Sequence, residues 1–219
     1  MVKSLIQVYR WSIRIATLLY CLYMIFFAEM YHFMALNVLL AYTPLEISFH
    51  LKKVQKRMFY LLGMFWLLFY PNAPYLFTDF FHLEQLTIYQ GMNQIFGQAL
   101  SDWVSFSLLT VGICVYGFLG MATVFTVLNE SIQRNIFIKK WQEFIFILLI
   151  NVLSSLAIFV GRFNRLHSVY VFTKPIQTVK IIFFDWSLNK MLFILLLTIV
   201  QIMFLAAIFG LKGLKLIED

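Results

Sequence analysis

Six stretches of this chain are nearly free of charged residues and are long enough, or almost long enough, to cross a lipid bilayer. They lie at about residues 11–28, 33–49, 58–70, 103–128, 141–160 and 190–211 of 219. A helix that spans the hydrocarbon needs about 20 residues. Backbone polar groups in lipid have to pair within the chain, which favours helices. We therefore expect an all-α, polytopic membrane protein with about six transmembrane helices in a single domain, residues 1–219.

The composition excludes most soluble classes of protein. Apolar residues make up 62% of the chain and charged residues only 12%, whereas a soluble domain is about a quarter charged. The formal net charge of +7 does not indicate a nucleic-acid partner, because the basic residues fall between the apolar runs. Cys21 and Cys114 lie inside such runs, so we expect packed thiols and no disulfide. We interpret the first run as a retained helix, since Glu29-Met30-Tyr31 is no signal-peptide cleavage site.

The distribution of lysine and arginine predicts the orientation. These residues occur before the first run, between the second and third, between the fourth and fifth, and after the sixth. The first connection and residues 70–101 have none. Because cytoplasmic loops carry the excess of basic residues, we expect a multi-pass cell-membrane protein with both termini in the cytoplasm. Residues 161–190 contradict this pattern with five basic residues on the outside, and a five-span model would move them inside.

A short amphipathic helix is predicted in that basic outer segment. Thr173-Lys174-Pro175 has the form of a helix start, with threonine as N-cap and proline in the first turn. One face of the following helix would be apolar, through Ile176, Val179, Ile182, Phe183 and Trp186. This pattern is typical of a helix that lies in the membrane interface.

The third apolar run is interrupted by two prolines. Pro71 and Pro74 each lack a backbone N–H and crowd the preceding turn. We therefore predict that the third helix ends at Tyr70 to Asn72 and that a separately directed helix follows, containing Asp79 and His82. Broken helices often build binding sites in transporters, and the alternative is a plain loop at the membrane surface.

Four polar side chains share one face of this second helix: Thr78, Asp79, His82 and Gln85. Asp79 and His82 are close enough in sequence for the carboxylate to orient the imidazole. The pair suits a proton acceptor, half of a metal site or a structural contact. Asp102, near the start of the fourth run, is expected to be a helix N-cap on the same side of the membrane.

Arginines at the outer end of the fifth run need partners near the bilayer, and Arg162 and Arg165 are three residues apart there. In the six-span model Asp79 lies on the same side. We therefore expect an outward-facing pocket for an anionic group; the alternative is that the arginines contact lipid phosphates. The predicted binding residues are Asn72, Tyr75, Asp79, His82, Asp102, Arg162, Arg165 and His167.

Several of these motifs resemble a bacterial membrane-protein family known as domain of unknown function 1361. They are Pro71-Asn72-Ala73-Pro74-Tyr75, Thr78-Asp79 with His82-Leu83, Asp102, Gly161-Arg162-Phe163 with Arg165, and Asn37 with Pro44 in the second run. The resemblance covers about residues 32 to 176 and implies kinship without implying an activity. The family pattern has asparagine and aspartate where this chain has His167 and Tyr170.

Three functions fit these features. The first is a protein that binds or translocates an anionic small molecule or lipid headgroup. The second is an enzyme acting on a lipid-linked substrate, with His82 as general acid–base and Asp79 orienting it. The third is an accessory subunit that packs on another membrane protein. We expect membrane lipids as partners, no cofactor and no metal, because no nucleotide or zinc motif occurs and the spacing of Asp79, His82, Asp102 and His167 does not require an ion. We favour binding, because no complete catalytic constellation can be assembled.

Overall fold

The computed structural model describes residues 2–28, 30–86, 89–90, 95–96, 99–164, 173 and 175–214. The regular structure of these residues is helical apart from one small hairpin, in which β1 (Tyr89–Gln90) pairs antiparallel with β2 (Ile95–Phe96), Tyr89 opposite Phe96. The helices are α1 (Val2–Phe26), α2 (Phe33–Leu51), α3 (Lys56–Phe69), α4 (Asn72–Tyr75), the 3-10 helix η1 (Leu76–Gln85), α5 (Leu100–Val111), the π-helix η2 (Gly112–Tyr116), α6 (Gly117–Gln133), α7 (Lys140–Phe163), α9 (Pro175–Phe183) and α10 (Leu188–Leu214).

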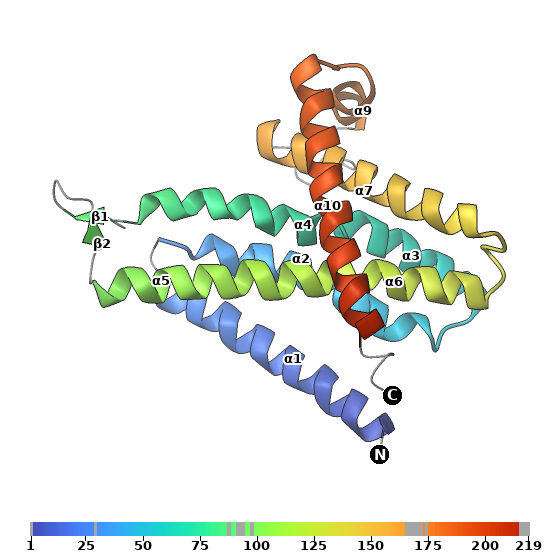
Figure 1. Cartoon of the computed structure of the whole chain (residues 1–219), viewed down its shortest axis with the longest axis horizontal. Helices are drawn as coiled ribbons and strands as arrows, with labels where there is room; N and C mark the ends of the chain where they lie inside the picture. Colours follow the sequence, from blue (N-terminus) through green and yellow to red (C-terminus); the bar gives the residue numbers. More distant parts are fainter. Residues whose placement is uncertain are drawn as a thin grey trace.

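The central layer is built from three rods that lie side by side (Figure 1). They are α2, the succession α3–α4–η1, and the succession α5–η2–α6. Helix α1 packs against α2, while α7 and α10 pack against each other and α10 crosses the rods. The largest cluster of buried apolar residues lies between these rods and α1, and it includes Met34, Val38, Leu76 and Met121.

Three helical stretches in the described residues are long and apolar enough to cross a membrane. They are Leu100–Gln133, Lys140–Phe163 and Leu188–Leu211. The third apolar run, residues 58–70, lies within and just beyond α3, which has 14 residues and is shorter than the roughly 20 residues that a spanning helix needs. Apart from the small hairpin, the described residues therefore form a helical protein, and three of its helices could cross a membrane by length and composition.

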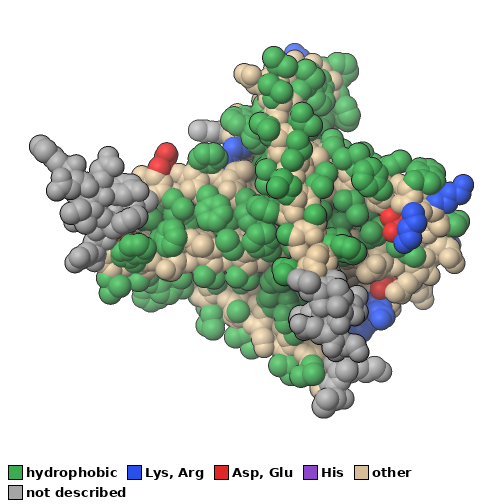
Figure 2. Space-filling view, in the orientation of Figure 1, with side chains coloured by type: hydrophobic (Ala, Val, Ile, Leu, Met, Phe, Trp, Pro, Cys, Tyr) green, Lys and Arg blue, Asp and Glu red, His purple; other side chains and the backbone are tan. Residues whose placement is uncertain are grey.

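The surface has the character of a protein surrounded by lipid. Large apolar side chains are exposed along α1, α3, α7 and α10; Leu196 of α10, for example, is 63% exposed. Figure 2 shows that apolar side chains cover most of the visible face, while Lys and Arg gather at the end where α6 is followed by α7. An apolar exterior of this extent is unusual for a soluble monomer, whose apolar patches are small.

The two prolines change the type of helix without reversing its direction. The regular hydrogen bonds of α3 end at Phe69, and the chain continues through α4 into the 3-10 helix η1. Tyr70, Pro71 and Leu76 nevertheless keep right-handed helical torsion angles. The expected helix with a separate direction is therefore not what the structure shows: Asp79 and His82 lie on η1, which continues the same rod (Figure 1).

Small residues allow the rods to approach closely near these prolines. A Cβ atom added to Gly120 of α6 would lie 2.4 Å from the Cβ of Ala73 in α4. Pro74 and Ala73 are both buried at this crossing. The short helix α4 is thus held between α2 and α6, which fixes the position of η1 and its polar residues.

A buried lysine fixes the short helix α9 to the start of α10. The Nζ atom of Lys190 donates to the carbonyl oxygens of Ile181 at 2.7 Å and Asp185 at 3.1 Å. It therefore neutralises the carbonyl end of α9, where the helix dipole favours a cation. Thr173 is itself helical and so is not the predicted N-cap; Lys174 lies outside the described residues, and α9 begins at Pro175. Ile176 is 86% exposed, in keeping with an apolar face that points outward.

Candidate functional site

Asp79 is the only acidic side chain in the described part of η1 that is fully buried, and two other helices supply its partners. Its Oδ2 atom accepts a hydrogen bond of 2.8 Å from Nδ2 of Asn37 in α2. Its Oδ1 atom lies 3.0 Å from Nη1 of Arg162 in α7. Because a buried carboxylate is costly unless it is paired, these contacts explain how η1 accommodates it.

Arg162 joins the end of α7 to the α4–η1 segment. Besides its ion pair, Nη1 donates to the Tyr75 hydroxyl at 2.9 Å and Nη2 donates to the Thr78 carbonyl at 2.8 Å. The guanidinium also lies over the Tyr75 ring, 5.2 Å from its centroid. Arginine suits this site better than lysine would, because its planar guanidinium donates several hydrogen bonds in fixed directions.

His82 lies at the accessible edge of this cluster. Its Nε2 atom is 3.9 Å from Oδ1 of Asp79, and its ring packs against Phe33 with 4.7 Å between centroids. The side chains of His82 and Arg162 are 29% and 24% exposed, whereas Asp79 is fully buried. Within this cluster the accessible groups are therefore the nitrogen atoms of His82 and Arg162, whereas the carboxylate of Asp79 is enclosed.

Two of the predicted site residues lie beside the cluster without joining it. Asn72 donates from Nδ2 to the carbonyl of Phe69 at 2.9 Å, so it stabilises the end of α3. Asp102 is not the predicted N-cap: Ala99 is the cap of α5, and Asp102 lies in the first turn. There the carboxylate still faces the positive end of the helix dipole. Arg165 and His167 lie outside the described residues.

Tyr31 joins the connection between α1 and α2 to η1. This residue lies in the connection between α1 and α2, and its hydroxyl donates to the backbone carbonyl of His82 at 3.1 Å. Burial raises the pKa of Tyr31, and the nearby charge of Asp102 raises it further. The hydroxyl therefore stays protonated at physiological pH and remains a hydrogen-bond donor to η1.

A second ionic network, which was not predicted from the sequence, lies at the opposite end of α2. Arg14 of α1 forms a two-pronged ion pair with Glu46, which also accepts from the Tyr42 hydroxyl. Nε2 of His50 lies 3.1 Å from the same carboxylate. The signal was present, since Arg14 and Glu46 are charged residues within apolar runs and such residues need a partner. The sequence does not show, however, how α1 and α2 are rotated about their axes, and this rotation brings Arg14 and Glu46 together.

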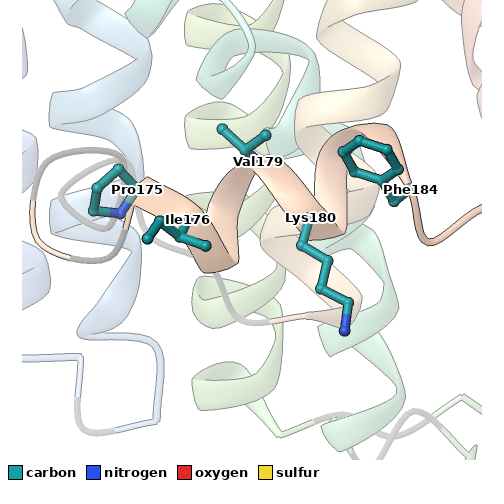
Figure 3. A pocket seen from close by; sticks show the side chains of 5 residues that line it. All are labelled: Pro175, Ile176, Val179, Lys180 and Phe184. Carbon is teal, nitrogen blue, oxygen red and sulfur yellow. The ribbon is translucent and has the colours of Figure 1, made fainter.

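Two hollows among the described residues are not lined by Asp79, His82 or Arg162. Each has a volume of about 460 Å³. One is an open surface along α9, and Figure 3 shows its lining side chains, including Lys180 and Phe184. The other lies between the end of α1 and the start of α5, and Tyr31 forms part of its wall. The described residues also contain no group of three or more His, Cys, Asp or Glu side chains that could hold a metal.

Comparisons with known proteins place the chain in a family without assigning an activity. No curated protein and no solved structure matched it. A family model described as "Protein of unknown function (DUF1361)" matches residues 36–204, a stretch that includes Asn37, Asp79 and Arg162. The match covers most of the chain and agrees with the resemblance of the sequence motifs, so the protein belongs to the DUF1361 family.

Proposed function

We propose that the protein spans the cell membrane six times, with both termini in the cytoplasm. Helices α1, α2 and the rod α3–α4–η1 would supply the three spans beyond the long apolar helices. The alternation of basic and Lys/Arg-free connections supports this orientation. The Asp79–Arg162 pair then belongs to the extracytoplasmic half, together with the hairpin that follows η1.

Cysteine labelling tests this topology. In a background with Cys21 and Cys114 replaced by alanine, we would introduce Met92→Cys, Ile176→Cys or Asn135→Cys, one at a time. A membrane-impermeant maleimide applied to intact cells should label positions 92 and 176. Position 135, in the connection that follows α6, should react only after permeabilisation. Labelling of positions 92 and 176 from opposite sides would refute six spans in favour of five.

The function that we propose is the binding or translocation of an anionic small molecule or lipid headgroup at the edge of this cluster. The observation that carries the proposal is the polarity of the site: the carboxylate of Asp79 is enclosed, and the accessible groups are those of His82 and Arg162. Guanidinium and imidazole donors suit carboxylates and phosphates. Arg165 and His167, which the sequence adds to the proposed binding residues, lie outside the described residues.

A second candidate is an enzyme that acts on a lipid-linked substrate. The observation that favours it is the Asp79–His82 pair, with 3.9 Å between Oδ1 and Nε2. A carboxylate at this position could orient the imidazole as a general acid–base. Asp79 is, however, already bonded to Asn37 and Arg162, which is the arrangement of a structural anchor. We therefore place binding ahead of catalysis.

Lipid retention in nanodiscs tests both candidates. The full chain would be reconstituted in nanodiscs made from equal parts of phosphatidylglycerol and phosphatidylcholine. Native mass spectrometry would then identify the lipids that stay bound to the protein when it is released from the nanodisc. We expect enrichment of phosphatidylglycerol, lowered about tenfold by His82→Gln, since a hydrogen bond to a charged group contributes about 1.5–3 kcal/mol. His50→Gln is the matched control, because His50 is an exposed histidine at the other end of α2.

The outcomes separate the candidates. If inorganic phosphate raises the apparent Tm of the protein but neither lipid is enriched, the ligand is a soluble anion. Retained lipid with an altered mass, absent in His82→Gln, would favour the enzyme. Equal retention of both lipids together with no response to phosphate would refute the binding site, as would equal losses in His82→Gln and His50→Gln.

A further inference from the structure

A group of buried polar side chains lies half-way along α7 and α10, away from the outer cluster. Asn151, Ser154 and Ser155 share one face of α7, at the spacing i, i+3 and i+4. Thr198 and Gln201 belong to the facing side of α10. All five are buried, and Asn151 and Ser155 are fully so. Both helices are candidate membrane spans, and these residues are near the middle of each.

Part of this group only holds the two helices together. The hydroxyl oxygens of Ser155 and Thr198 are 2.9 Å apart, and Nε2 of Gln201 donates to Ser155 at 2.7 Å. Nδ2 of Asn151 donates to the carbonyl of Ile147 at 2.7 Å, within α7. Small polar residues commonly join helices in membranes in this way. These bonds use the nitrogen donors of both amides, and the amide oxygens are left over.

Three oxygen atoms of the group remain without a partner. Oδ1 of Asn151, Oγ of Ser154 and Oε1 of Gln201 are buried and make no hydrogen bond to any residue that the structure describes. Buried polar atoms in proteins are nearly always satisfied, and an exception points to a water or ion. The need is greater at membrane depth, where bulk water is absent. The hydrogen bonds that join the two helices do not involve these oxygens. A water or an ion is therefore needed to satisfy them.

We propose that these oxygens form a binding site for a sodium ion between α7 and α10. Amide and hydroxyl oxygens are the ligands that hard cations prefer. The set contains Asn151, Ser154 and Gln201 and no carboxylate, which suits a monovalent ion better than a divalent one. Ion sites of membrane transporters commonly lie near the bilayer midplane, and the middle of two spanning helices satisfies that condition. Figure 1 shows α7 and α10 crossing each other.

This site is separate from the anionic site at the end of α7. Arg162 follows Ser155 by seven residues, which corresponds to about 10 Å along a helix. Sodium binding therefore does not depend on the proposed ligand of the outer cluster. If both sites are occupied, α7 would contact the two ligands through residues on one continuous helix.

Direct measurement of ²²Na⁺ binding tests the proposal. The full chain, purified in detergent and immobilised on scintillation beads, should bind ²²Na⁺ saturably in choline chloride buffer, and excess unlabelled NaCl should displace it. Ser154→Ala and Asn151→Leu each remove a ligand oxygen and should weaken binding about tenfold or more. Ser48→Ala is the matched control, because it removes a buried serine hydroxyl from α2 that bonds to the carbonyl of Leu45. This variant should bind like the wild type.

The apparent Tm distinguishes a loss of sodium binding from a loss of folding. The apparent Tm of the wild type should be higher in NaCl than in choline chloride, because a ligand that binds the folded state stabilises it. This difference should disappear in Asn151→Leu while the variant still melts cooperatively. If the wild type shows no saturable binding and no sodium-dependent Tm, the proposal is wrong and the oxygens hold a water. Equal loss of binding in Ser154→Ala and Ser48→Ala would also overturn it.

Discussion

Removing Arg162 alone should destabilise the protein more than removing Arg162 and the charge of Asp79 together. In Arg162→Met the fully buried carboxylate of Asp79 loses its arginine and keeps the hydrogen bond from Asn37, with His82 at 3.9 Å. In the double variant Asp79→Asn/Arg162→Met no charge remains, and a neutral amide takes the place of the carboxylate. The main cost of breaking the ion pair is therefore the free energy of leaving one charge buried without its partner.

The expected size follows from the burial of the pair. Removing one partner from a buried ion pair costs about 3–5 kcal/mol, whereas replacing both partners is often nearly neutral. For a chain of this length, 1 kcal/mol corresponds to about 2–4 °C in Tm. Arg162→Met should then lower the apparent Tm by about 6–20 °C, and the double variant by clearly less. Asp79→Asn alone should be milder than Arg162→Met, because Arg162 keeps Tyr75 and the Thr78 carbonyl and is partly exposed.

The native cysteines provide the assay. Cys21 and Cys114 are free and partly buried, so a thiol-reactive dye reports their exposure as the purified protein unfolds in detergent. Lys140→Met is the control, because the Lys140–Glu143 pair has a lysine side chain that is 93% exposed. Such a surface pair contributes about 0–1 kcal/mol. If the double variant loses as much Tm as the sum of the two single variants, Asp79 and Arg162 are not a coupled buried pair.

Two further predictions concern helix packing. Gly120→Ala should lower the Tm by several degrees, because the new Cβ would lie 2.4 Å from that of Ala73, and overpacking costs about 1–3 kcal/mol. Gly63→Ala, where nothing lies within 4 Å of the added atom, should leave the Tm unchanged or raise it; equal effects of the two would contradict the packing of α4 on α6. Lys190→Met should increase amide hydrogen exchange in α9 by removing the cation from its last carbonyls, and unchanged exchange there would show that α9 is held by other contacts.

The sequence contained the apolar runs and the need for pairing, but not the rotation of each helix. An arginine at the end of an apolar run and a carboxylate among phenylalanines both require partners, so a contact between Arg162 and Asp79 could be inferred. The two residues are 83 positions apart, and their contact depends on how α7 lies against η1. The same limit explains why the pairing of Arg14 with Glu46 was missed.

The prolines show a different limit of sequence reasoning. Pro71 and Pro74 lack the N–H groups of a regular α-helix, so an interruption was predictable. Proline also fixes φ near the helical value, and here the backbone stays helical while its hydrogen bonds change to the 3-10 pattern. Whether such a chain turns away or continues depends on its neighbours. Close packing of Ala73 against Gly120 holds it in line.

The π-helix Gly112–Tyr116 gives the long rod α5–η2–α6 one place where its length can change by a residue. A π turn closes i→i+5 hydrogen bonds and so takes up one residue more than an α turn, while the helix beyond keeps its orientation. Deleting one residue inside this turn would leave a continuous α-helix, with Gly117 and Gly120 still facing η1 and α4. The same deletion within a regular part of the rod would turn every following side chain by about 100° and remove both glycines from their contacts. Insertions and deletions among related chains should therefore concentrate in this turn.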